Sequence, residues 1–258
     1  MKQIFNKKFS FFIIIALFLG SLPALSMTKA ALKHYNNANT LHKINDLEGA
    51  IQELEMAIKL SPDDALIHIK LAGILSEQGK WKEALRLYNE AARLRPDDAF
   101  IYISIGNILQ QHNDYKNALG AYMQAQILAP DYKYNYLNIA TTRTLLGDAK
   151  GALDYYNKFL DYYPDHIETR ENIASIYLSQ NMNEEAAKEY EKIFTANPEK
   201  FKEYANYGKS LILSKNYEKA IDILEKAVLR NPEDVGAHLN LGLAYVNKEQ
   251  KEKALNEY

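Results

Sequence analysis

The sequence predicts an all-α protein made of stacked, antiparallel helix pairs, and three observations support this class. Prolines recur every 34 residues, at positions 62, 96, 130, 164, 198 and 232, and a fixed interval of this size is typical of repeat proteins. Apolar and small residues within each interval follow helical spacing. The 258-residue chain contains no cysteine, so stability must come from packing rather than from disulfides.

The clearest interval is residues 65–98, and it predicts two amphipathic helices. Its apolar and small residues follow helical spacing in two sets: His68, Leu71, Ala72 and Leu75 at i, i+3, i+4 and i+7, then Trp81, Ala84, Tyr88 and Ala91 at i, i+3, i+7 and i+10. Gly79 lies between the two sets, and Pro96 ends the second helix because proline lacks an N–H donor. Asp97 and Asp98 then offer acceptors to the free N–H groups of the next helix. Each unit is therefore helix, turn, helix and stop.

Three places within the 34-residue unit keep the same kind of residue in every copy. Place 8 is small throughout: Ala38, Ala72, Gly106, Ala140, Ala174, Gly208 and Gly242. Place 20 is alanine throughout: Ala50, Ala84, Ala118, Ala152, Ala186, Ala220 and Ala254. Place 24 is large: Leu54, Tyr88, Tyr122, Tyr156, Tyr190, Leu224 and Tyr258. Small residues let two helices approach closely, and large ones fill the space between units.

This pattern resembles the tetratricopeptide repeat (TPR) family over residues 31–258. The resemblance implies a right-handed superhelix, or α-solenoid, of about six full units and a partial seventh, which start at residues 31, 65, 99, 133, 167, 201 and 235. The departures are local. Arg143 replaces an apolar residue at place 11, and Phe159 and Ile193 replace alanine at place 27.

Residues 1–26 do not belong to the repeats and have the layout of a secretory signal peptide. Lysines precede an apolar run from Phe11 to Gly20, and small residues follow, so cleavage is expected after Ser26. The alternative is a membrane anchor formed by residues 11–27, although Pro23 interrupts that run. Both alternatives place the repeats outside the cytoplasm, in the periplasm, the cell envelope or the medium.

Composition and motifs give no support for nucleic-acid binding or catalysis. The net charge is −2 and the pI is about 6.3, which leaves no basic footprint for nucleic acid. The stretch from Gly73 to Trp81 resembles a phosphate-binding loop but has the wrong glycine spacing and tryptophan in place of Ser or Thr. The six histidines lack metal-ligand spacing, and His68 and His238 occupy the packing position at place 4. We therefore expect no enzymatic activity, no cofactor and no metal.

The candidate site is a row of polar residues at place 6: Asn36, Lys70, Ser104, Asn138, Asn172, Asn206 and Asn240. The TPR resemblance implies that this face lines a concave groove, and the row is similar to the asparagine ladder in the TPR arm of O-linked N-acetylglucosamine transferase, which holds extended polypeptide through its backbone. An asparagine amide can pair with both the N–H and the C=O of a peptide unit. The candidate peptide-binding residues are Asn138, Asn172, Asn206, Asn240, Tyr134 and Thr141. The alternative is that these asparagines are tolerated polar residues on a solvated face.

The groove lacks the basic residues that bind a terminal carboxylate, and this indicates which class of peptide it suits. TPR proteins that hold a C-terminal carboxylate use a basic residue at place 5, whereas here that place reads Tyr35, Ile69, Ile103, Leu137, Glu171, Ala205 and Leu239. The groove is therefore expected to suit an extended or helical peptide with hydrophobic side chains.

Three hypotheses about function remain open from the sequence. The first is an exported, non-catalytic scaffold that helps to assemble a protein complex. The second is the TPR arm of a larger envelope enzyme, such as a glycosyltransferase, truncated at residue 258. The third is self-association through the last unit, whose second helix is short and leaves its apolar face open at Tyr258.

Overall fold

The computed structural model describes residues 27–198 and 203–258, which form fourteen helices and no strand. The helices are α1 (Lys29–Lys43), α2 (Leu47–Leu60), α3 (Ala65–Glu77), α4 (Trp81–Leu94), α5 (Ala99–Gln111), α6 (Tyr115–Leu128), α7 (Tyr134–Leu145), α8 (Ala149–Leu160), α9 (Ile167–Ser179), α10 (Asn183–Ala196), α11 (Tyr204–Leu213), α12 (Tyr217–Arg230), α13 (Val235–Asn247) and α14 (Lys251–Glu257). The predicted signal peptide lies outside the described residues, and so does the alternative membrane anchor except for its last residue, Met27. None of the described helices is long and apolar enough to cross a bilayer.

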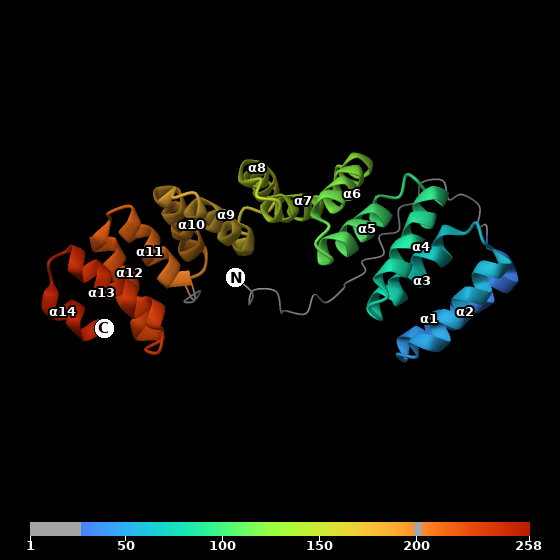
Figure 1. Cartoon of the computed structure of the whole chain (residues 1–258), viewed down its shortest axis with the longest axis horizontal. Helices are drawn as coiled ribbons and strands as arrows, with labels where there is room; N and C mark the ends of the chain where they lie inside the picture. The colour runs from blue at the N-terminus through green and yellow to red at the C-terminus, as the bar shows by residue number, and fades with distance from the viewer. Residues whose placement is uncertain (1–26, 199–202) are drawn as a thin grey trace.

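The helices form consecutive antiparallel pairs that stack into an elongated, arched array (Figure 1). Odd-numbered helices are helix A of each unit and even-numbered ones are helix B. The last pair, α13 and α14, ends in a helix B of 7 residues, half the 14 residues of α12. The predicted all-α solenoid of helix pairs, with a partial seventh unit, is confirmed.

Every turn between helix A and helix B has the same backbone geometry. One residue at place 15 adopts a positive φ of 60–78°: Asn45, Gly79, Asn113, Gly147, Asn181, Lys215 and Glu249. The next N–H then donates back to a carbonyl near the end of helix A, for example from Lys80 to Leu75 at 2.9 Å. This arrangement is a Schellman motif, which satisfies carbonyls that the end of a helix leaves unpaired.

Aspartates begin many of the helices. The carboxylates of Asp64 and Asp98 accept hydrogen bonds from backbone N–H groups of α3 and α5, at 3.0 and 3.1 Å. Asp46, Asp114 and Asp148 cap the B helices α2, α6 and α8 in the same way. The predicted sequence of proline stop followed by aspartate cap is confirmed at the start of α5, where Asp98 follows Pro96.

The conserved places of the unit form the core. The alanines at places 8 and 20 are almost fully buried, and so are the large residues at place 24, except Tyr258 at 65% exposed. Gly106 shows why place 8 must be small, since an added Cβ would lie 2.6 Å from the ring of Tyr122. Close approach within a unit therefore depends on these small residues.

The departures from the family pattern are accommodated within the fold. Arg143 forms an ion pair with Asp148 and lies over the ring of Tyr155 at 5.4 Å. Phe159 and Ile193 are fully buried. Phe159 fills its position with ring contacts to Tyr134, Tyr163 and His166.

The histidines at place 4 have a structural role, as the sequence indicated. His68 Nε2 lies 2.7 Å from the carbonyl oxygen of Pro62, and His238 Nε2 lies 3.0 Å from that of Pro232. Other residue types at this place make the same contact, because the hydroxyl of Tyr204 donates to the carbonyl of Pro198. The side chain at place 4 therefore ties helix A to the proline turn that precedes it.

Candidate functional site

The candidate site lies along the face formed by successive A helices, which we call the A-helix face. Two of the side chains at place 6 form hydrogen bonds with the neighbouring A helix. Lys70 Nζ of α3 lies 3.1 Å from His42 Nδ1 of α1, and the Asn240 amide of α13 donates to the carbonyl of Ala205 on α11 at 3.1 Å. Place 6 therefore marks the seam between adjacent units.

Asn138 and Asn172, in the middle of the array, have unused side-chain amides. Asn138 lies on α7 and Asn172 on α9, and both side chains are half-buried. Neither amide has a hydrogen-bond partner among the described residues. Because a half-buried amide loses part of its hydration, an incoming peptide group that replaces water there gains more than at a fully exposed position.

The other two predicted asparagines have partners within the chain. The Asn206 amide donates to the Glu203 carboxylate at 3.0 Å, and Asn240 holds Ala205 as described above. Asn206 is exposed, and its contact lies within one turn of the same helix. Asn240 instead links two units, so this side chain has a packing role that the sequence pattern alone did not distinguish from binding.

Tyr134 and Thr141 both lie on α7 with Asn138, but they differ in how available they are. Thr141 Oγ1 is 3.2 Å from the hydroxyl of buried Tyr156, whose pKa is raised by burial. Tyr134 is 48% exposed. The structure thus brings Tyr134, Asn138 and Thr141 onto one helix, with Tyr134 and Asn138 free to meet a ligand.

Apart from Tyr134, sequence reasoning missed the exposed apolar side chains on the same helices. At place 2, Leu32, Leu66 and Phe100 join Tyr134, one in each of the first four units, and near the C-terminal end the exposed apolar side chains are Leu213, Leu239, Leu243 and Val246. A comparison of place 2 across the copies would have found the first group. In the second group, Leu239, Leu243 and Val246 follow i, i+4, i+7 spacing on α13, and Leu213 ends α11.

Charges on the A-helix face of the first two units pair with one another. Lys70, His42 and Glu77 form one chain of contacts, in which His42 Nε2 lies 2.8 Å from a carboxylate oxygen of Glu77. Burial lowers the pKa of the Lys70 ammonium, and the Glu77 carboxylate opposes this effect. These charges are engaged with one another, whereas the A helices of units three and four present mainly Ser, Asn, Gln, Thr and apolar side chains.

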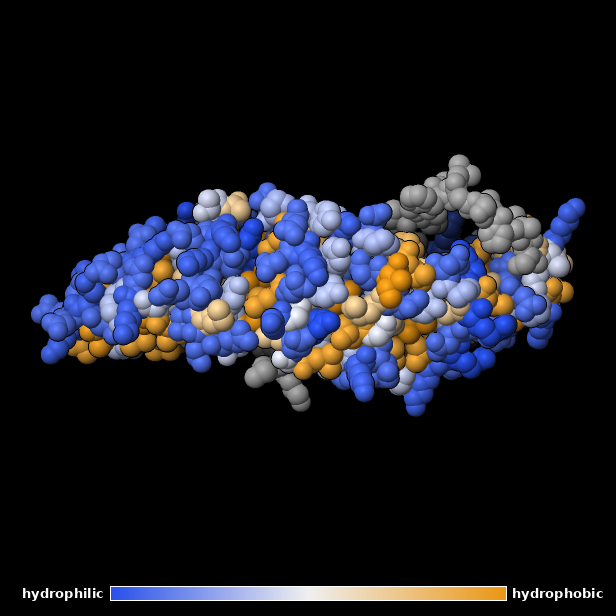
Figure 2. All heavy atoms as spheres, turned by 90° about the horizontal axis from the view of Figure 1, so that it is seen from above, coloured by the Kyte–Doolittle hydropathy of each residue, from blue (hydrophilic) through white to orange (hydrophobic). Residues whose placement is uncertain are grey.

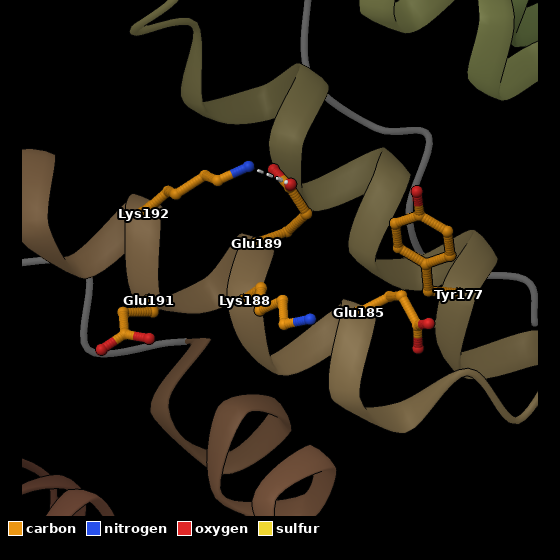
Figure 3. Close-up of a pocket in the computed structure, with 6 residues that line it drawn as sticks. All are labelled: Tyr177, Glu185, Lys188, Glu189, Glu191 and Lys192. Carbon is orange, nitrogen blue, oxygen red and sulfur yellow. Dashed lines mark hydrogen bonds and ion pairs between the residues drawn. The ribbon is translucent and has the colours of Figure 1, made fainter.

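A shallow depression of about 460 Å³ lies over α9 and α10 (Figure 3). Its lining is mostly charged, and the central carboxylate, Glu189, pairs with Lys192 at 2.6 Å and with Arg170 at 2.8 Å. Glu191 pairs with Lys219 at 2.6 Å, so most of the lining charges are already paired within the chain and the depression offers little to a ligand. The described part of the chain also holds no group of three or more residues placed to bind a metal ion.

Solved structures with the same architecture come from several proteins. The structure described as YrrB, a TPR protein with an unusual peptide-binding site, is 24% identical, with a TM-score of 0.62 over 71% of this chain and 95% of its own. A tetratricopeptide repeat protein from Parabacteroides merdae ATCC 43184 is 16% identical, with a TM-score of 0.65 over 89% of this chain and 91% of its own. MamA from Desulfovibrio magneticus RS-1 is 17% identical, with a TM-score of 0.62 over 67% of this chain and 98% of its own. These likenesses show the fold alone.

No curated protein matches the chain. Four models of the tetratricopeptide repeat do, over residues 41–102, 134–166, 167–200 and 208–258. Together these matches cover well over half of the chain, and they agree with the 34-residue unit, its helix pairs and its buried small residues. The chain belongs to the tetratricopeptide repeat family.

Proposed function

We propose that this protein is a non-catalytic scaffold that binds an extended segment of a partner protein along the A-helix face and so assembles a complex outside the cytoplasm. The observation that carries the proposal is the pair of half-buried amides at Asn138 and Asn172, which lack hydrogen-bond partners among the described residues. They occupy equivalent places in adjacent units, so each can pair with a different peptide group of one extended chain.

The surroundings of these amides suit a peptide with apolar side chains. Exposed Phe100 and Tyr134 lie at place 2 of units three and four. Aromatic side chains supply contact area at low entropic cost. The peptide-binding site named in the description of YrrB supports the same use of a similar fold, although at 24% identity it does not locate a site on this chain.

The expected contribution of the two amides is modest. One hydrogen bond gives about 0.5–1.5 kcal/mol net, so two such amides give about 1–3 kcal/mol, or roughly 5- to 150-fold in affinity. Apolar contacts must supply the rest of the binding free energy, because ordering a flexible peptide carries its own cost.

The test is selection of a random 12-residue peptide library on the immobilised chain, followed by titration of the best peptides. The double variant Asn138→Ala/Asn172→Ala should weaken binding by the factor above. Asn157→Ala is the matched control, because Asn157 is an exposed asparagine on α8 of the same unit. Equal affinity of the wild type and the double variant would exclude these amides from the site.

The export proposal rests on residues 1–26 and is tested separately. Fusion of the full chain to alkaline phosphatase, which is active only after export from a bacterial cytoplasm, should give an active reporter. N-terminal sequencing of the exported chain should begin at Met27. An inactive fusion would refute export, and an active fusion that keeps residues 1–26 would support the membrane-anchored alternative.

A further inference from the structure

Four aromatic rings from two successive units form a continuous exposed strip. Phe100 begins α5, Tyr132 lies in the loop before α7, Tyr134 begins α7, and Tyr163 lies in the loop after α8. Successive ring centroids are 5.2, 6.2 and 5.3 Å apart. We call these four residues the aromatic strip.

The strip is both exposed and supported from below. Phe100, Tyr134 and Tyr163 are 56, 48 and 37% exposed, and Tyr132 is half-buried between them. Phe159, which is fully buried, contacts Tyr134 and Tyr163 at centroid distances of 5.6 and 4.7 Å. Exposed aromatic side chains held in this way are typical of an interaction site. Seen from above in Figure 2, the array as a whole carries areas of apolar surface among hydrophilic side chains.

The tilt of the rings decides what fits the strip. The planes of successive rings meet at 64, 42 and 41°, so the strip presents notches rather than one flat platform. A flat base or sugar ring stacks on a single face, whereas notches between aromatic side chains accept proline rings. The two steps from Phe100 to Tyr134 span less than about 12 Å, close to the roughly 9 Å of one polyproline II turn.

Charge next to the strip selects the flanking residues of the ligand. Three exposed aspartates occupy place 33 of successive units, in the loops before α5, α7 and α9, namely Asp97, Asp131 and Asp165. The nearby cation, Lys133, is already engaged with the carbonyl of Pro130, with Asp131 and with the ring of Tyr162. A ligand with basic side chains gains attraction to the carboxylates and cation–π contact with the tyrosines, whereas an acidic ligand is repelled.

We propose that the aromatic strip binds a proline-rich segment in the polyproline II conformation that carries Arg or Lys between its prolines. This proposal rests on the proposed function in that the partner is a polypeptide, but it specifies the chemistry of the partner and uses residues other than the asparagine amides. Only Tyr134 is common to both.

The test uses a fluorescently labelled 12-residue peptide of repeated Pro-Pro-Arg. Its anisotropy is measured as the full chain, purified from its own host, is titrated in. Saturable binding is expected, and Phe100→Ala or Tyr134→Ala should weaken it about tenfold each. Asp131→Asn should weaken it about threefold and reduce its salt dependence. The matched control is Leu229→Ala, because Leu229 is an exposed apolar residue, at 78%, on α12 away from the strip.

Several results would overturn the proposal. A Gly-Gly-Arg repeat that binds as tightly as Pro-Pro-Arg would show charge attraction alone, and a Pro-Pro-Glu repeat that binds equally would remove the role of the aspartates. Unchanged affinity in Tyr134→Ala would exclude the strip. A dimeric mass in sedimentation that becomes monomeric in Tyr134→Ala would identify a second copy of the chain as the occupant. Loss of Pro-Pro-Arg binding in Asn138→Ala/Asn172→Ala, with no effect of Phe100→Ala, would assign the peptide to the amides and refute only the strip.

Discussion

Replacing Lys215 by glycine should stabilise unit six. Lys215 has φ of 64°, in the left-handed region, and its side chain is exposed with no hydrogen bond or ion pair among the described residues. In this region a Cβ destabilises the folded state by about 1–2 kcal/mol, whereas glycine, which has no Cβ, adopts the conformation at almost no cost. Glycine also raises the conformational entropy of the unfolded chain, which lowers the free energy of unfolding by about 0.4–1 kcal/mol. The expected net gain is therefore about 0.5–1 kcal/mol.

The other units provide the controls. Gly79 has φ of 75° in the equivalent turn of unit two, so Gly79→Lys should lose about the amount that Lys215→Gly gains. Lys215→Ala keeps the Cβ and removes the amine, and it should leave stability unchanged. This control separates backbone strain from charge.

The assay must be local because units of a repeat array can unfold separately. Amide hydrogen exchange, followed by mass spectrometry on peptides from α11 and α12, reports the opening of unit six alone. Lys215→Gly should slow exchange there about two- to fivefold and leave α3 and α4 unchanged. If exchange in unit six is faster in Lys215→Gly, or if Lys215→Ala has the same effect as glycine, the strain argument is refuted.

Three further predictions test capping, packing and pH dependence. Lys80→Asp should raise the free energy of unfolding by about 1 kcal/mol in urea titration, because Lys80 has the backbone geometry of Asp46 and Asp114 but gives α4 no side-chain cap. Phe159→Ala restores the alanine that other units carry at place 27, yet it should lower the unfolding free energy by about 3–5 kcal/mol, because the buried ring leaves a cavity. A hydrogen bond to Glu257 at 2.7 Å raises the pKa of His238. The contact therefore stabilises α14 in full below the pKa of about 6.5 that histidine has in the unfolded chain, and this stabilisation is lost as the pH rises through the higher pKa of the folded state. Amide protection of α14, corrected for intrinsic exchange, should therefore decrease from about pH 6 to about pH 8 in the wild type and stay level in His238→Gln.

The fold was predictable from the sequence because its rules are local and repeated. Pro96 ends one helix, Asp98 begins the next and Ala84 marks a close contact, and each rule recurs every 34 residues. The role of Lys215 was not predictable from residue type, since lysine has no preference for positive φ. Comparison with Gly79 and Asn113 at the same place supplies the missing signal.

The candidate site was predictable only in part. Helical periodicity placed Asn138 and Asn240 on one face but could not show that the Asn240 amide is used by Ala205 while that of Asn138 has no partner. That difference depends on how closely adjacent A helices approach, which varies between units. Tyr134 was among the predicted residues, but the rest of the aromatic strip was missed for a related reason: Tyr132 and Tyr163 lie in loops, outside the helical pattern, and meet Tyr134 only after two units have stacked.

The aromatic strip also has a mechanical consequence. Solenoids bend through small rotations between neighbouring units, and the rings of the strip belong to two of them. Any such rotation changes the distance between Phe100 and Tyr163, so bending and occupancy of the strip are thermodynamically linked. A rigid polyproline segment across these rings would stiffen the middle of the arch and fix the angle between the units before the strip and the units after it. Conversely, a partner that binds the units on both sides of the strip would change the affinity of the strip for its peptide without contacting the rings.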